Sequence, residues 1–297
     1  MIYDVTLNIA YDYPAAVKDA RHVLRVRPRE LDGQSVRAAR VTVAPHPDEA
    51  GRELDFFGNA LDQLLILPEH EALSVEMRAR VELRRALPDL EATPTIADLA
   101  AAAAAARETG PTGPMHFLGD SRSARRTDAV SAYARELIDP AAPAGEAVLA
   151  FASRMKADFS FAPGATTVDT PLEEAFAKRE GVCQDFAHVM IAALRGVGVP
   201  AAYVSGFLRT LPPPGRPRLE GADAMHAWVD VWLGPDMGWQ GFDPTNGVTV
   251  LDDHVVVAIG RDYSDVAPID GVVLTAGPQK TSHSVDVVPV GERVRKA

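Results

Sequence analysis

Three residues in this sequence have the types and positions needed for attack on an amide bond. Cys183 is the one cysteine of the chain, and it lies at the predicted start of a helix. Unpaired N–H groups and the helix dipole at such a position favour a thiolate and can stabilise an oxyanion. His226 opens a predicted strand and Asp243 ends another. Their order and placement predict a nucleophile, a base and a residue that orients the base.

Each of these residues also has a structural interpretation, and two other functions stay open. A lone cysteine is most often a small buried apolar residue. A histidine at a strand end can be a hydrogen-bonded core residue, and Asp-Pro favours an aspartate that caps a turn. The three side chains are also acceptable zinc ligands, although the sequence has no second cysteine and no His-x-x-x-His spacing. A peptide-binding module without catalysis is the remaining alternative.

The elements that must position the three residues follow from apolar spacing. From residue 183 to 197, apolar residues recur at steps of three and four and predict a helix with one apolar stripe, ended by glycines. Residues 202–207 and 226–233 predict two strands, and a third short strand ends at Asp243. Residues 170–173 predict a capping box for a preceding helix that stops near Gly181. Residues 212–215, Pro-Pro-Pro-Gly, predict a loop.

The rest of the chain divides by a change of pattern near two prolines. Residues 1–90 alternate apolar and polar, at 3–11 and 73–83 above all, and predict an antiparallel β domain with a turn at 57–59. Residues 91–158 are rich in alanine and predict a helical connector and the start of the core. Residues 159–297 are predicted to form the core that carries the chemistry.

Composition limits the classes of partner that the protein can bind and the cellular compartment that we expect for it. The formal net charge of −11 argues against a nucleic-acid or anionic membrane surface, because both need clustered Lys and Arg. One cysteine permits no intrachain disulfide, which is typical of a reducing compartment. The N-terminus has no basic and apolar leader pattern, and no apolar run reaches membrane-spanning length. We therefore expect a cytoplasmic protein that binds neither nucleic acid nor a membrane.

Several sequence blocks resemble the bacterial transglutaminase-like cysteine proteases. The blocks are residues 179–188 (REGVCQDFAH), 198–207 (GVPAAYVSGF), 226–229 (HAWV), 238–246 (GWQGFDPTN), 260–263 (GRDY) and 285–287 (VDV). Residues 27–29 (RPR) and 57–59 (FGN) are similar to the β-rich domain that precedes the core in this group. The resemblance covers nearly the whole chain, and the three central blocks occur in the family's order.

The resemblance implies an α+β fold, with an antiparallel N-terminal β domain before a papain-like transglutaminase core. It also implies a triad of Cys183, His226 and Asp243, with no cofactor and no metal. The expected activity is acyl transfer from peptide or isopeptide amides of peptides or proteins through a thioester. Hydrolysis is the expected outcome, and transamidation is a second route.

Five further polar residues lie near the triad in the sequence or on the elements predicted to position it. His188 lies five positions after Cys183, roughly 140° around the helix at about 100° per residue, and is expected to be structural. Asp185 is also expected to be structural, and Gln184 is a minor candidate for the oxyanion site. Tyr203 and Asp223 are candidates for lining the cleft.

Overall fold

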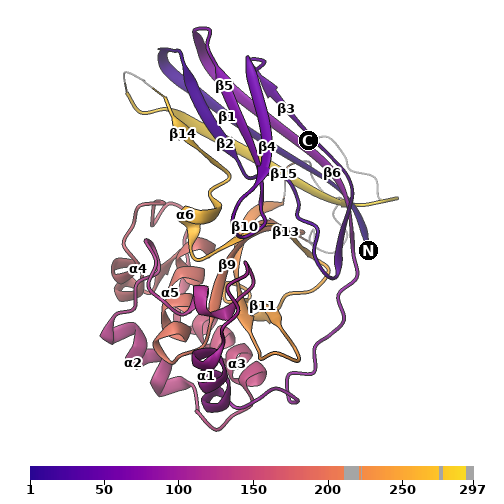
Figure 1. The fold of residues 1–297 in the computed structure, drawn as a ribbon. Coiled ribbons are helices and arrows are strands. Elements are labelled where there is room, and N and C mark those ends of the chain that lie inside the picture. Colours follow the sequence, from indigo (N-terminus) through magenta and orange to yellow (C-terminus); the bar gives the residue numbers. More distant parts are fainter. Residues whose placement is uncertain (211–220, 222, 274–276, 292–297) are drawn as a thin grey trace, which may run out of the picture.

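The computed structural model describes residues 1–210, 221, 223–273 and 277–291, so the predicted loop at 212–215 lies outside the described residues. The described chain forms a β-rich domain and an α+β core, which lie one above the other in Figure 1. The predicted α+β class and the order of its two parts are confirmed.

The N-terminal domain consists of two four-stranded antiparallel sheets, ordered β15-β1-β6-β3 and β14-β2-β5-β4. Their strands are β1 (Ile2–Val17), β2 (Ala20–Leu24), β3 (Gln34–Ala44), β4 (Glu49–Leu54), β5 (Ala60–Ile66), β6 (His70–Leu83), β14 (Ile269–Val272) and β15 (Lys280–Pro289). The alternating residues of β1 and β6 point inward as predicted, and side chains such as Leu7 and Met77 are buried in one apolar cluster.

The C-terminal strands correct the predicted domain boundary. Val5 of β1 pairs with Val287 of β15, and Leu24 of β2 pairs with Ile269 of β14. The chain thus leaves the core and returns to the N-terminal domain, where the C-terminal strands lie beside the first ones (Figure 1). Pairing between residues 245 (Leu24 and Ile269) and 282 (Val5 and Val287) positions apart leaves no signal in local apolar spacing, so the sequence pattern places residues 269–289 with the core.

Helices connect the two parts, as the alanine-rich sequence predicts. They are α1 (Ile96–Ala105), the short 3-10 helix η1 (Pro114–Phe117), α2 (Asp128–Leu137) and α3 (Ala144–Asp158). Thr95 and Thr127 cap α1 and α2 by accepting a hydrogen bond from the backbone three residues on. No helix in the described ranges combines the length and the apolar character needed to cross a bilayer.

The helix before the cysteine starts differently from the prediction. β7 (Ser160–Phe161) pairs with β8 (Glu180–Gly181), and α4 (Leu172–Lys178) lies between them. The predicted capping box is absent from α4: its N-cap is Pro171, and the Thr170 hydroxyl accepts from the amide of Thr167 instead. The helix ends at Lys178, and Arg179 caps it in a left-handed conformation (φ 54°), two residues before the predicted stop near Gly181.

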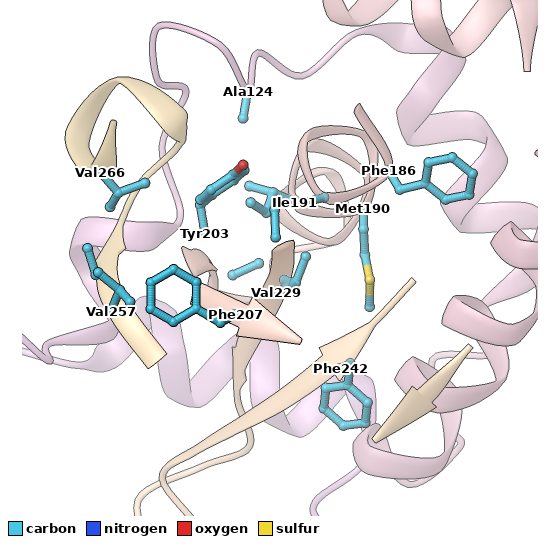
Figure 2. Packing of buried hydrophobic residues seen from close by; sticks show 14 of the residues in the cluster. Ala124, Phe186, Met190, Ile191, Tyr203, Phe207, Val229, Phe242, Val257 and Val266 are labelled. Atoms are coloured by element: carbon cyan, nitrogen blue, oxygen red, sulfur yellow. The ribbon is translucent and has the colours of Figure 1, made fainter. Parts of the chain in front are cut away.

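The core is one antiparallel sheet with a buried helix against it. The sheet has the order β12-β11-β10-β9-β13, and its strands are β9 (Ala201–Leu208), β10 (Ala224–Trp232), β11 (Trp239–Asp243), β12 (Val248–Thr249) and β13 (His254–Gly260), followed by α6 (Tyr263–Val266). The helix α5 (Cys183–Gly196) packs on β9 and β10. Figure 2 shows Met190 and Ile191 of α5 packed in the same cluster as Val229 and Phe242 of the sheet.

The environment of α5 goes beyond the predicted apolar stripe. Every residue from Asp185 to Arg195 is buried, so neighbours surround the helix on all sides. A helix held this way cannot rotate or slide without disrupting the core. The first turn of α5, which carries Cys183, is therefore fixed relative to the sheet.

Candidate active site

Cys183 is the first residue of α5, and its side chain is half-buried. The N-cap residue before it, Val182, has no side chain that can cap the helix. Asp185 compensates, because its carboxylate accepts a hydrogen bond from the Val182 amide (2.8 Å) and another from the Thr166 hydroxyl (2.6 Å). This arrangement leaves Cys183 at the positive end of the helix dipole. The structural role expected of Asp185 is confirmed.

His226 lies on β10 and joins Cys183 to Asp243. Its Nε2 atom is 2.8 Å from Oδ2 of Asp243, and the imidazole is buried. Burial disfavours the charged ring, but hydrogen bonds to Asp243 and Cys183 and the charges of both outweigh it and raise the pKa of His226 to about 10. Because Nε2 is directed at Asp243, Nδ1 is the ring atom left to serve the thiol. The structure thus brings the three predicted residues together.

Asp243 ends β11 and is 0% exposed. Its Oδ1 accepts hydrogen bonds from the amides of Thr245 (2.9 Å) and Asn246 (3.1 Å), while Nδ2 of Asn246 reaches Oδ2 (2.6 Å). Burial raises the pKa of this carboxyl, but bonds to His226, His254 and Asn246 hold it well below the ordinary range. The turn-capping and histidine-orienting interpretations therefore both apply, one to each oxygen.

Sequence reasoning missed His254, the first residue of β13. Its Nε2 atom is 3.1 Å from the same Oδ2 of Asp243, and its ring packs edge-on to Trp228 (5.1 Å between centroids). Nothing in the spacing separates this histidine from the other seven of the chain. The contact comes from the three-dimensional arrangement: β9 and β10 separate β13 from β11 in the sheet, and the rings of His254 and His226 lie 6.0 Å apart between centroids.

His226, Asp243 and His254 are also the candidate set for a metal ion within the described residues. Both imidazoles, however, direct Nε2 at one carboxylate oxygen at hydrogen-bond distances of 2.8 and 3.1 Å. A cation would have to break both bonds and take the same lone pairs. We therefore interpret the cluster as a hydrogen-bonded network.

His188 and Gln184, two of the five further polar residues, lie outside this hydrogen-bonded network. His188 is buried and accepts a hydrogen bond from the amide of Tyr263 (3.2 Å), which confirms its structural role. Gln184 donates to the carbonyl of Val168 (3.3 Å), across the surface rather than toward an oxyanion position.

Neither candidate for lining the cleft has an open position. Tyr203 is 2% exposed within the core cluster behind α5. Asp223 is buried, and its carboxylate accepts hydrogen bonds from the amides of Thr210 and Val287 (2.6 Å each). It therefore ties the segment before β10 to β15.

A cavity of about 690 Å³ lies where the N-terminal domain, the connector and the core sheet meet. Its walls include Arg29, Phe57, Arg85, Trp228, Asp230 and Trp239. Cys183 does not line it. Trp228 separates this cavity from the two histidines, since its ring contacts both of them.

Known proteins are similar to this chain in sequence and in fold. The sequence matches the Transglutaminase-like superfamily over residues 131–244 and the Bacterial transglutaminase-like N-terminal region over residues 3–82. An uncharacterized protein of Mycobacterium tuberculosis is 37% identical over 294 residues, which cover 97% of this chain and 92% of the relative. A Pseudomonas aeruginosa protein-glutamine gamma-glutamyltransferase is 36% identical over 88 residues, which are 29% of this chain and 13% of that protein.

Among solved structures, the "Putative Cysteine Protease" from Cytophaga hutchinsonii is similar over 99% of this chain and 92% of its own, with a TM-score of 0.76 and 20% sequence identity. This likeness concerns the fold, and it includes both domains. Together with the full-length relative and the two matching regions, it leads to one conclusion. The chain belongs to the transglutaminase-like superfamily and carries the bacterial transglutaminase-like N-terminal region.

Proposed function

We propose that the protein is a cysteine-dependent enzyme that transfers acyl groups from peptide or isopeptide amides, with water as the usual acceptor. The observation that carries the proposal is the buried His226–Asp243 hydrogen bond of 2.8 Å, with Cys183 close enough to His226 to raise its pKa. A nucleophile, a base and a carboxylate that orients the base are the parts that this chemistry requires.

The reaction follows from the charges. His226 holds its proton up to about pH 10, and in the proposed mechanism this imidazolium stabilises the thiolate that attacks the substrate. The thiolate attacks the amide carbonyl, and the N–H groups of the first turn of α5 face the developing oxyanion. His226 then protonates the leaving amine, which departs and leaves a thioester on Cys183.

The second half of the reaction restores the cysteine. Neutral His226 takes a proton from water or from an amine, which attacks the thioester carbonyl. The thiolate leaves, and the imidazolium that has formed pairs with it again. Water yields a carboxylic acid, and an amine yields a new amide. The gamma-glutamyltransferase name of the Pseudomonas relative supports including the second route.

Turnover of a panel of peptide amides, including glutamine side-chain amides, tests the proposal. Each substrate is incubated with and without an added primary amine, and products are identified by mass spectrometry. We expect wild type to release an acid, to form a new amide where an amine is accepted, and to form a transient thioester adduct on Cys183. Cys183→Ala is the matched control. Product formation at equal rates by both proteins would contradict the mechanism.

A further inference from the structure

A second histidine shares the carboxylate of the triad, although the chemistry above does not use it. His254 lies 11 positions after Asp243 in the sequence, on the other edge of the sheet from β12. Its Nε2 atom is 3.1 Å from Oδ2 of Asp243, compared with 2.8 Å for Nε2 of His226. Both rings are buried, so solvent does not compete for either bond.

The two imidazoles play different electrostatic parts. Burial lowers the pKa of His254, and the charges of His226 and Arg85 lower it further, against the opposing effect of Asp243. In contrast, the pKa of His226 is raised. One imidazolium and one neutral imidazole therefore face Asp243. A neutral ring that donates from Nε2 has its lone pair on Nδ1, and Nδ1 of His254 has no partner among the described residues.

The position of His254 is fixed from the N-terminal domain. Arg85 follows β6, and its Nη1 atom donates to the carbonyls of His254 (2.6 Å) and Leu251 (2.7 Å). On the other side, the ring of Trp228 contacts the imidazole edge-on. Because Arg85 holds the backbone of His254 and Trp228 packs against its ring, the Nε2–H of His254 is held toward Asp243.

We propose that His254 is a positioning residue, a neutral imidazole whose Nε2–H holds the Asp243 carboxylate in the orientation that pairs it with His226. This inference rests on the proposed function. Without the bond, Oδ2 would keep Nδ2 of Asn246 and Nε2 of His226 as donors, while the backbone amides of Thr245 and Asn246 still hold Oδ1. The direction of Oδ2 relative to the His226 ring would then be less fixed. His254 itself touches neither thiol nor substrate.

Two substitutions separate hydrogen bonding from packing. His254→Phe keeps a ring against Trp228 and removes the N–H, while His254→Gln places an amide N–H near the original Nε2 and removes the ring. The readout is the rate at which iodoacetamide alkylates Cys183 at pH 6, which needs no substrate. We expect His254→Phe to slow alkylation by about 10- to 100-fold, as for loss of a hydrogen bond to a charged group. We expect His254→Gln to stay within about threefold of wild type.

Three results would overturn or reassign the role. Alkylation of His254→Phe within about threefold of wild type would show that the N–H is dispensable. A His254→Gln variant as slow as His254→Phe would assign His254 to packing. If wild type itself resists alkylation at pH 6, the proposed function fails, and that result is distinct from the first two.

Nitrogen-15 NMR of the wild-type imidazoles keeps the inference testable even if a variant does not fold. At pH 7 we expect His254 as the neutral tautomer with its proton on Nε2, and His226 with protons on both nitrogens. A charged His254, or one with its proton on Nδ1, would overturn the inference regardless of the variants.

Discussion

Two buried amide side chains of the N-terminal domain pair with the backbone of the core sheet, whereas the buried histidine and carboxylate of the triad pair with each other. In the N-terminal domain, Gln34 exchanges two hydrogen bonds with the backbone of Val256, each 2.8 Å long. Asn59 does the same with the backbone of Ile259, again at 2.8 Å. In the core, buried His226 and Asp243 pair with each other.

The difference in partners indicates that the N-terminal domain supports the core sheet, while the core carries the triad. β13 is an edge strand of the core sheet, and an edge strand presents unpaired N–H and C=O groups. The two amides of the N-terminal domain occupy those groups much as a neighbouring strand would. β13, which begins with His254, is thereby held in place, and the side chains of the core remain available for the triad.

Replacing the nucleophile would have the largest effect. Cys183→Ala should abolish turnover and all thiol alkylation, because the chain has no other cysteine. The half-buried position predicts little change in folding, which thermal unfolding can check. Measurable turnover by Cys183→Ala would place the chemistry elsewhere in the molecule.

Asp243→Asn sharpens the contrast by leaving the nucleophile and the base in place. The comparable change in serine-protease triads lowers turnover about 10⁴-fold, and we expect a loss of that order. The raised pKa of His226 keeps the imidazolium, and the activity that depends on it, until the pH rises through about 10.

Removing the carboxylate charge should lower that pKa and move the basic limb of the pH–rate profile toward neutrality. A profile of kcat/KM against pH measures both effects in one series. An Asp243→Asn variant with the wild-type basic limb would mean that the carboxylate does not control the charge of His226.

Gln34→Ala tests the bracing of β13 by the N-terminal domain. It would leave buried backbone groups of Val256 without partners, so we expect the free energy of unfolding to fall by about 1–3 kcal/mol. The matched control is Gln63→Ala, at the exposed position of β5, where we expect a change within about 0.5 kcal/mol. Urea unfolding of both variants measures the difference. An equal loss of unfolding free energy in Gln34→Ala and Gln63→Ala would show that Gln34 does not stabilise the edge of the core sheet.

The smallest effect is expected at Gln184, next to the nucleophile. Its amide donates to the carbonyl of Val168, so Gln184→Ala should change kcat by less than about threefold. Loss of an oxyanion donor costs about 10²- to 10³-fold. A loss of that size, measured under saturating substrate, would make Gln184 part of the oxyanion site.

Local pattern was enough to predict the elements that carry the triad. α5 begins at Cys183, and β11 ends at Asp243, as the apolar spacing and the Asp-Pro turn indicate. Alternation likewise predicted β1 and β6. These features depend on residues close together in the sequence, so periodicity and turn chemistry record them.

Tertiary contacts could not be predicted from local pattern. The pairing of β15 with β1 joins residues far apart in the sequence, and the approach of His254 to Asp243 depends on how side chains of different strands meet in space; single-sequence periodicity encodes neither. The missed start of α4 has a local cause, because Thr170 turned its hydroxyl to Thr167 instead of to the helix. Competing side-chain bonds of this kind are equally consistent with the same four residues.

The pH dependence of Cys183 alkylation, in wild type and in His226→Ala, tests whether Cys183 is a nucleophile activated by His226. An ordinary thiol, with a pKa of about 8.5, is almost fully protonated at pH 6. We expect rapid alkylation of wild type at pH 6 and slow alkylation of His226→Ala until the pH approaches 8 or above, because the variant lacks the imidazolium that stabilises a thiolate. With one cysteine in the chain, total thiol loss reports this site alone. If both profiles are centred above pH 8 and His226→Ala leaves the profile unchanged, Cys183 is not a nucleophile activated by His226.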